Sequence, residues 1–180
     1  MHILAISGSL KTSSSNTILV RAIAAMAPET MRFTIYDGLA DLPHFNPDLD
    51  LDGEDAPTPV VRLRGLLQAA DGVLICTPEY AFGVPGALKN ALDWTVSSGE
   101  FAGKPVAAIS ASPSYMGGDK AHASLLLTLT AEAARIVDGG TLIIPAIGKK
   151  LAADGDVSDP ATAEALRSVL AALARTINAR

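Results

Sequence analysis

The sequence predicts an α/β fold of three layers, in which helices cover both faces of a five-stranded parallel sheet. Short runs of high strand propensity alternate along the chain with segments of helical periodicity, which is typical of parallel strands joined by helices. Several of these runs are almost continuously apolar, as expected for strands covered on both faces. The chain has 180 residues without a linker or repeat, so residues 1–180 are expected to form a single domain.

The expected elements follow in alternation. The strands are residues 2–7, 32–36, 72–76, 105–110 and 141–145. The helices are residues 17–27, 60–70, 86–96, 119–137 and 161–179. Five strands favour the flavodoxin-like order 2-1-3-4-5 over a six-stranded dinucleotide-binding sheet. The acidic stretch 41–59 is expected to be a long solvated loop, because its carboxylates lack the spacing of a calcium loop.

Composition excludes several classes of protein. The formal net charge is −5, so no basic surface for nucleic acid is expected. No apolar run reaches the roughly 18–20 residues that span a bilayer, and the N-terminus has no basic region of a signal peptide. The single cysteine, Cys76, allows no internal disulfide and is interpreted as a core residue. His2, His44 and His122 show no metal-binding spacing, so no metal site is expected. Because no membrane span, signal peptide or cysteine pair is recognisable, a cytoplasmic protein is expected.

Ligands of such a fold bind beyond the carboxyl ends of the strands, where the winding reverses. Three loops are therefore of interest: SGSLKTSSSNT at 7–17, TPEYAFGVPG at 77–86 and SASPSYMGGDK at 110–120. The first contains seven hydroxyl side chains in eleven residues, with Asn16 at a natural N-cap position. A helix N-terminus, hydroxyl donors and the charge of Lys11 together suit a phosphate group. A serine-rich loop with an ordinary N-cap is the alternative.

Two segments carry a family resemblance. GSLKTSSSN at 8–16, together with TPEYAFGVPGALKNALDW at 77–94, resembles the NADPH-dependent FMN reductase family, a flavodoxin-like group that includes chromate, azo-dye and quinone reductases. The similarity continues through ADLPHFNPDLD at 40–50 to the ADGDVSD turn at 153–159. It implies FMN as cofactor, NADPH or NADH as co-substrate, and a quinone, azo compound, metal oxyanion or free flavin as acceptor.

The resemblance also implies site residues. The phosphate would be held by Ser9, Lys11, Ser14, Ser15, Asn16 and Thr17. The ribityl chain and ring would pack along Pro78, Glu79, Tyr80, Ala81 and Phe82. The third loop, with Ser112 and Ser114, would approach the pyrimidine edge, while Phe82, Gly83 and Tyr115 would face the substrate. A flavin is planar and mostly apolar, so prolines that stiffen a flat wall and glycines that permit close approach, Gly83 and Gly86, suit this loop.

The sequence departs from the family pattern at three places. Lys11 stands where arginine is usual, which replaces a bidentate fork with a point charge. Ala81 and Gly83 replace the asparagine and serine of the common PEYNGS, and Ser114 stands where glycine is common. The backbone path at Ser114 is therefore in question. Phe82 has the alternative reading of a core or interface residue.

No pair of nucleophile and base is recognisable, so the cofactor is expected to carry the chemistry and no side chain is expected to be catalytic. An enzyme is favoured, and a non-enzymatic electron carrier of the flavodoxin type is the alternative. A homodimer or homotetramer is expected through helices 86–96 and 119–137. Leu125, Leu126 and Leu127 cannot all face one core. Leu129, Ile136 and Val137 are expected to continue this apolar patch, and the preceding helix extends it with Ala87, Leu88, Ala91 and Leu92.

Overall fold

The computed structural model describes residues 1–50 and 56–179. Its strands are β1 (His2–Ser7), β2 (Arg32–Tyr36), β3 (Gly72–Thr77), β4 (Pro105–Ala111) and β5 (Arg135–Ile144). Its α-helices are α1 (Ser15–Met26), α2 (Thr58–Ala69), α3 (Gly86–Asp93), α4 (Asp119–Ala131) and α5 (Pro160–Asn178). Among the described residues, the short 3-10 helices η1 (Pro47–Leu49) and η3 (Ile147–Lys149) lie in loops.

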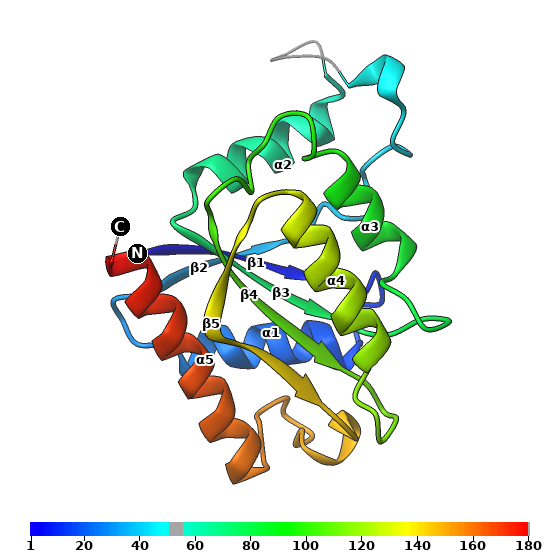
Figure 1. The fold of residues 1–180 in the computed structure, drawn as a ribbon. Helices are drawn as coiled ribbons and strands as arrows, with labels where there is room; N and C mark the ends of the chain where they lie inside the picture. Colours follow the sequence, from blue (N-terminus) through cyan, green and yellow to red (C-terminus); the bar gives the residue numbers. More distant parts are fainter. Residues whose placement is uncertain (51–55, 180) are drawn as a thin grey trace.

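The described strands form one parallel sheet in the order β2-β1-β3-β4-β5, which confirms the predicted fold class and strand order. All residues of β3 and β4 are buried, as their continuous apolar runs predicted. The sheet is covered on both faces, with α1 and α5 on one side and α2, α3 and α4 on the other (Figure 1).

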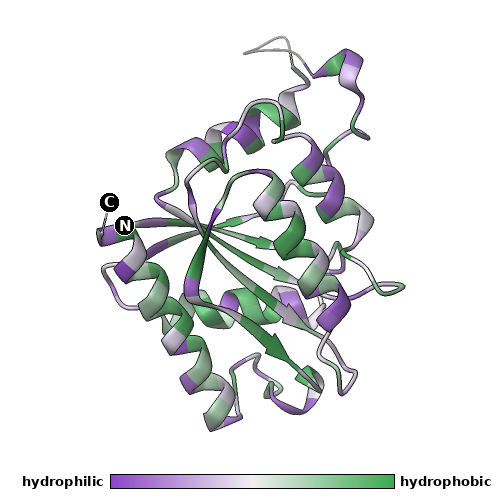
Figure 2. Cartoon of the chain, in the orientation of Figure 1, coloured by the Kyte–Doolittle hydropathy of each residue, from purple (hydrophilic) through white to green (hydrophobic). Residues whose placement is uncertain are grey.

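Each face of the sheet has its own hydrophobic core. Alternate residues of one strand point to opposite faces, so Val73 and Ile75 of β3 join the core under α2, α3 and α4, whereas Leu74 and Cys76 join the core under α1 and α5. Figure 2 shows the apolar colour concentrated along the strands and the polar colour on the outer parts of the helices. Cys76 is fully buried, which confirms it as a core residue, and Trp94 is fully buried as well.

The C-terminal part of the expected fourth helix is instead the start of β5. The helix ends at Ala131 because Ala133 takes a positive φ of 54°, which a continuing right-handed helix does not allow. Ile136 then pairs with Val106 of β4, and its β-branched side chain suits a strand. The ladder resumes with Thr141 opposite Ala108. Over this bulge β4 advances two residues while β5 advances five, so the expected strand at 141–145 was only its second half.

The other boundaries differ from the prediction by a few residues, and one capping residue was wrong. Helix α1 is capped by Ser14, whose side chain accepts a hydrogen bond from the backbone N–H of Asn16. Asn16 is therefore inside the first turn and is not the N-cap. The shift has a physical basis, since a serine hydroxyl in extended backbone is an efficient acceptor for the first free N–H groups of a helix.

The long loop before α2 is fastened at one acidic residue. Asp50 forms a buried ion pair with Arg64, which also donates hydrogen bonds to the main-chain carbonyl of Trp94. Burial raises the pKa of Asp50, but hydrogen bonds from Ser97 and Arg64 lower it further, so that this pKa lies below its usual value. The expectation of a wholly solvated acidic loop is thus wrong at Asp50, and Asp52, Glu54 and Asp55 lie outside the described residues. No described helix has the length and hydropathy of a membrane span.

Candidate functional site

The three loops singled out in the sequence meet at one edge of the sheet. They leave the carboxyl ends of β1, β3 and β4, which are adjacent strands. The β1–α1 loop begins against the end of β3, because the N–H of Gly8 donates to the carbonyl of Cys76 over 2.8 Å. A Cβ atom at Gly8 would lie 2.9 Å from the side chain of Leu88 and 3.0 Å from that of Thr77. A larger residue would force Leu88 or Thr77 to shift, so Gly8 is a closely packed residue at the site that sequence reasoning did not single out.

A cavity of about 210 Å³ lies between these loops. Its lining includes most of the predicted cofactor residues: Ser9, Lys11, Ser14, Ser15, Asn16, Pro78, Glu79, Tyr80 and Ser112. It also includes three residues that were not predicted: Ser13, Ala111 and Pro113. Four predicted residues are not in the lining: Thr17, Ala81, Phe82 and Ser114.

The β1–α1 loop presents its hydroxyls at the start of α1. Ser9 is buried, and its Oγ lies 3.3 Å from the Tyr80 hydroxyl, so the first two loops also meet through side chains. Lys11 is exposed and forms no ion pair with any described residue. Thr17 turns inward, with its Oγ1 2.9 Å from Ser7 Oγ. The cavity is therefore bordered by hydroxyl donors, one lysine charge and a helix N-terminus, which is the chemistry that an anion requires.

The side chain of Asn16, which belongs to the cavity lining, is engaged by two hydrogen bonds. Asn16 is 3% exposed. Its Nδ2 donates to the carbonyl of Ala111 over 3.0 Å, and its Oδ1 accepts a hydrogen bond from the Cys76 thiol over 3.1 Å. Burial raises the pKa of that thiol, so the thiol stays protonated and can donate.

Glu79 connects the β3–α3 loop to helix α4. Its Oε2 accepts hydrogen bonds from the backbone N–H groups of Lys120 and Ala121 over 2.9 Å and 3.0 Å. The N-cap of α4 is Gly118, which has no side chain to satisfy these donors. A carboxylate at this end also interacts favourably with the helix dipole. Glu79 therefore orients the start of α4 beside the cavity, a role that its sequence position alone did not reveal.

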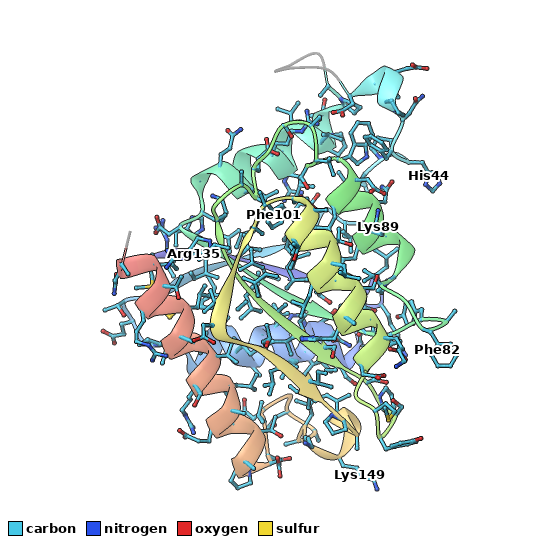
Figure 3. All side chains as sticks on the ribbon, in the orientation of Figure 1. His44, Phe82, Lys89, Phe101, Arg135 and Lys149 are labelled. Atoms are coloured by element: carbon cyan, nitrogen blue, oxygen red, sulfur yellow. The ribbon has the colours of Figure 1, made fainter. Side chains whose placement is uncertain are left out.

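The tip of the β3–α3 loop is a tight reversal. Tyr80 and Gly83 exchange two backbone hydrogen bonds, and Ala81 and Phe82 between them have positive φ values of 49° and 61°. Two successive positive φ values characterise a type I′ turn, which strongly favours asparagine and glycine. Phe82 is 80% exposed, and Figure 3 shows it projecting from the body of the molecule. Phe82 is therefore not a core residue of the subunit.

The β4–α4 loop is held in a defined shape. The backbone N–H of Ser112 donates to the carbonyl of Ile144, and that of Ser114 to Ser112 Oγ. Ser114 has no positive φ, so the usual glycine is not required there. Gly117 is required, because its φ is +66° and a Cβ would lie 2.6 Å from Ile143. In the same loop, Tyr115 is 86% exposed.

The expected role of glycines in the β3–α3 loop is not seen within the chain. A Cβ at Gly83 would approach nothing closer than 3.9 Å, and one at Gly86 would meet nothing within 4 Å. The crowded glycines are Gly8 and Gly117 in the neighbouring loops. For Gly117, the sequence did offer a signal, which is the pair of adjacent glycines in SYMGGDK.

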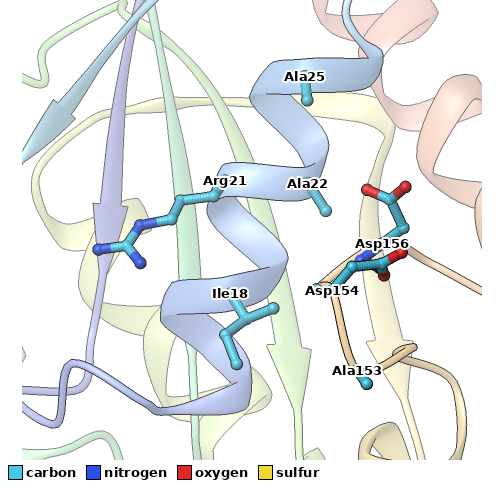
Figure 4. Close-up of a pocket in the computed structure, with 8 residues that line it drawn as sticks. Ile18, Arg21, Ala22, Ala25, Ala153, Asp154 and Asp156 are labelled. Carbon is cyan, nitrogen blue, oxygen red and sulfur yellow. Dashed lines mark hydrogen bonds between the residues drawn. The ribbon is translucent and has the colours of Figure 1, made fainter.

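Another cavity, of about 280 Å³, lies between α1 and the turn around residue 155. Figure 4 shows Arg21 extending away from Asp154 and Asp156, so the cavity has no paired charges across it. It lies away from the three loops and shares no lining residue with the 210 Å³ cavity. Among the described residues, no group of three histidine, cysteine or acidic side chains is placed to hold a metal ion.

Comparisons with known proteins agree with this picture. A family model described as NADPH-dependent FMN reductase matches residues 1–149. The quinone reductase of Escherichia coli K12 is 31% identical over 98% of this chain and 95% of its own length. An NAD(P)H-dependent FMN reductase of Pseudomonas aeruginosa is 32% identical over 96% of this chain and 93% of its own. The solved flavoenzyme NAD(P)H:(acceptor) oxidoreductase FerB of Paracoccus denitrificans is 33% identical, with a TM-score of 0.88 and coverage of 98% and 97%.

The sheet order and the convergence of the three loops define a flavodoxin-like oxidoreductase. Similarity over nearly the whole chain then gives the particular family. The chain belongs to the NADPH-dependent FMN reductases, and it is an NAD(P)H:acceptor oxidoreductase. The alternative of a carrier without enzymatic activity is set aside, because the matched relatives are reductases.

Proposed function

We propose that the protein binds FMN with its phosphate in the 210 Å³ cavity and reduces a quinone-type acceptor at the expense of NADPH or NADH. Residues 1–180 would act as a single FMN-binding domain, working in the cytoplasm. The observation that carries the proposal is the junction of hydroxyls, Lys11 and the N-terminus of α1 in one cavity. These groups are donors or positive charges, whereas a neutral ligand would need no such set.

The residues present fit FMN in size as well as in chemistry. Pockets that enclose a whole drug-sized ligand measure about 300–1,000 Å³, so the cavity of about 210 Å³ suits the phosphate end alone. The flavin ring would then lie outside it, against the exposed side chains of the neighbouring loops. Tyr80, Phe82 and Tyr115 are 55%, 80% and 86% exposed and supply aromatic surface there.

The chain's own residues would bind and orient. When bound, FMN accepts hydride from a reduced nicotinamide and passes two electrons to a second substrate. Ser9, Ser14 and Ser15 would donate to the phosphate, and Lys11 would balance its charge. Glu79 would hold the start of α4 in place, and Gly117 lets the β4–α4 loop pass close to β5. An acceptor would be recognised by the exposed aromatic surface, with Phe82, Gly83 and Tyr115 nearest to it. That surface favours a planar apolar acceptor such as a quinone, and two relatives carry quinone reductase names.

Cofactor identity is tested by releasing the bound flavin with heat and separating it against FMN and FAD standards. FMN is expected, since the sequence contains no second nucleotide-binding motif. Recovery of FAD, or failure of the apo-protein to take up FMN, would count against the proposal. Anaerobic mixing with NADPH, and separately with NADH, should bleach the flavin without any second protein.

Acceptor class is tested by comparing a benzoquinone with an azo dye, chromate and free FMN at equal concentration and a constant supply of NADPH. The quinone should give the highest kcat/KM. A preference for chromate would contradict the aromatic recognition surface, because a small oxyanion gains little from apolar walls.

We infer in addition that the subunit forms a homodimer or homotetramer through α4. Leu125 is buried, Leu126 is half-buried and Leu127 is 74% exposed, so the leucine run does extend beyond the core. The expected contribution of α3 is smaller, because Leu88, Ala91 and Leu92 are buried within the subunit and only Ala87 is partly exposed. Ile136 and Val137 belong to β5.

Light scattering at micromolar concentration tests this association. Wild type should have at least twice the subunit mass, and Leu127→Lys should lower it. Leu49→Lys is the matched control, since Leu49 is 44% exposed but lies on η1. A monomeric wild type would refute the inference.

A further inference from the structure

One buried carboxamide joins three elements at the wall of the cofactor cavity. Asn16 lies in the first turn of α1, Cys76 is next to the last residue of β3, and Ala111 is the last residue of β4. The two hydrogen bonds of Asn16, to the Ala111 carbonyl over 3.0 Å and from the Cys76 thiol over 3.1 Å, span these elements. The start of α1 is thereby tied to the two strands whose following loops line the rest of the cavity.

The orientation of the carboxamide follows from the chemistry of its partners. A main-chain carbonyl can only accept, so the amide nitrogen of Asn16 must face Ala111. The amide oxygen then faces Cys76, which must donate its S–H. The reverse orientation would bring two acceptor oxygens together at a fully buried site. The Ala111 carbonyl therefore determines which way Asn16 points, and the Cys76 thiol supplies the donor that the amide oxygen then needs.

Neighbouring contacts depend on the same arrangement. Gly8 at the entrance of the β1–α1 loop is bonded through its N–H to the carbonyl of Cys76 over 2.8 Å. At the other end of that loop, Ser14 Oγ accepts from the N–H of Asn16 over 3.2 Å. Both ends of the β1–α1 loop are thus bonded to Cys76 of β3, one through Gly8 and the other through Asn16. A small displacement of Asn16 would move the helix N-terminus relative to the serine hydroxyls.

We propose that Asn16 is a positioning residue whose side chain, held between the Ala111 carbonyl and the Cys76 thiol, keeps the N-terminus of α1 in place to receive the phosphate. Asn16 acts through the helix and not by side-chain contact with the phosphate, as the family resemblance had implied. This inference rests on the proposed FMN site.

The test is a titration of the apo-proteins with FMN and with riboflavin, which lacks the phosphate. Asn16→Ala should weaken FMN binding about tenfold, equivalent to about 1.4 kcal/mol, and change riboflavin binding less than twofold. Cys76→Ala should also weaken FMN binding selectively, but by less than Asn16→Ala. Cys76 is fully buried, so this loss would not come from a contact with the ligand. Cys76→Ser keeps a donor and should restore the FMN affinity. The double variant should bind FMN no more weakly than Asn16→Ala, because the two residues act as one unit.

Two outcomes would overturn the inference. FMN affinity of wild-type strength in Cys76→Ala, beside a loss in Asn16→Ala, would mean that Asn16 contacts the phosphate itself. Lowered thermal stability in both variants with an unchanged ratio of FMN to riboflavin affinity would mean a purely structural role. If Asn16→Ala does not fold, the comparison of Cys76→Ala with Cys76→Ser still decides.

The proposed function fails separately if wild type binds riboflavin as tightly as FMN. The inference is then judged by hydrogen exchange of the apo-proteins at residues 15–18. Faster exchange in Cys76→Ala than in Cys76→Ser supports a hold on the helix N-terminus. Equal exchange rates refute it.

Discussion

The turn at Ala81 and Phe82 should become more stable when either residue is replaced by glycine. A non-glycine residue in the left-handed region costs roughly 1–2 kcal/mol, and both residues are there, at φ of 49° and 61°. Glycine loses more backbone entropy on folding, by roughly 0.5–1 kcal/mol. The difference leaves a gain of about 0.5–1 kcal/mol per site. Removing the Phe82 ring forfeits little buried area, because the residue is 80% exposed.

Thermal unfolding of the apo-protein measures this gain. A change of 1 kcal/mol shifts Tm by about 2–4 °C in a chain of this size, so Phe82→Gly and Ala81→Gly should each unfold about 1–4 °C above wild type. Ala123→Gly is the matched control, because Ala123 is exposed within α4. Its Tm should fall, since glycine in a helix interior costs about 1 kcal/mol. If Phe82→Gly unfolds at or below the wild-type temperature, the strain argument is wrong.

The same pair of variants separates stability from acceptor recognition. Phe82→Gly removes the exposed ring, so KM for a quinone should rise several-fold while the FMN affinity stays near wild type. Ala81→Gly relieves comparable strain and keeps the ring, so its KM should not change. Equal KM values in the two variants would remove Phe82 from the acceptor surface.

Three further predictions concern single side chains. Lys11→Ala should weaken FMN binding about five-fold at low salt and less at high salt, because an exposed charge is screened. Lys11→Arg should bind FMN as well as wild type or better. Equal FMN affinities of wild type and Lys11→Ala at both salt concentrations would exclude Lys11 from the site. Glu79→Ala removes the acceptor of two N–H groups at the start of α4 and should destabilise the fold by about 1–2 kcal/mol in urea unfolding. Glu79→Gln keeps an acceptor oxygen and should retain most of that stability. If the two variants are equally unstable, Glu79 does not cap α4. Burial raises the pKa of Glu132 to about 7 from 4.5, so the folded state binds the proton more tightly than the unfolded chain, and this contribution is complete below about pH 4.5 and lost as the pH rises through about 7. Glu132→Gln stays neutral and should therefore be more stable than wild type near pH 8 but not near pH 4, and parallel stability curves would rule out Glu132 as the titrating group.

Most of the sheet could be predicted because β1, β3 and β4 are nearly continuous apolar runs. β1 and β2 have the predicted bounds, and β3 and β4 extend one residue further. The exception is the junction of α4 and β5. Residues 132–137 contain alanines and a glutamate that suit a helix, and the positive φ of Ala133 that ends it is not encoded by a glycine or asparagine. Pairing with β4 overrides local propensity there, which no local pattern reveals.

The candidate site was predictable by position more than by contact. Hydroxyls and Lys11 at the start of a helix identified the β1–α1 loop, and most of the expected residues do line the cavity. The inward orientation of Asn16 was not predictable, because its partners Cys76 and Ala111 are far along the chain and one of them is a main-chain carbonyl. The capping of α4 by Glu79 was not predictable either, because the backbone donors lie 41 and 42 residues away and leave no sequence pattern near Glu79.

The 95-residue separation between Asn16 and Ala111 sets an order of events during synthesis. The loop that carries Lys11 leaves the ribosome early, but the carbonyl that satisfies Asn16 is made only when β4 is complete. A chain released before that point has the serines and the lysine but neither the third wall nor the helix held against it. We therefore expect the proposed flavin site to form only after β3 has paired with β4, so that a nascent chain able to bind flavin should already contain the centre of its sheet.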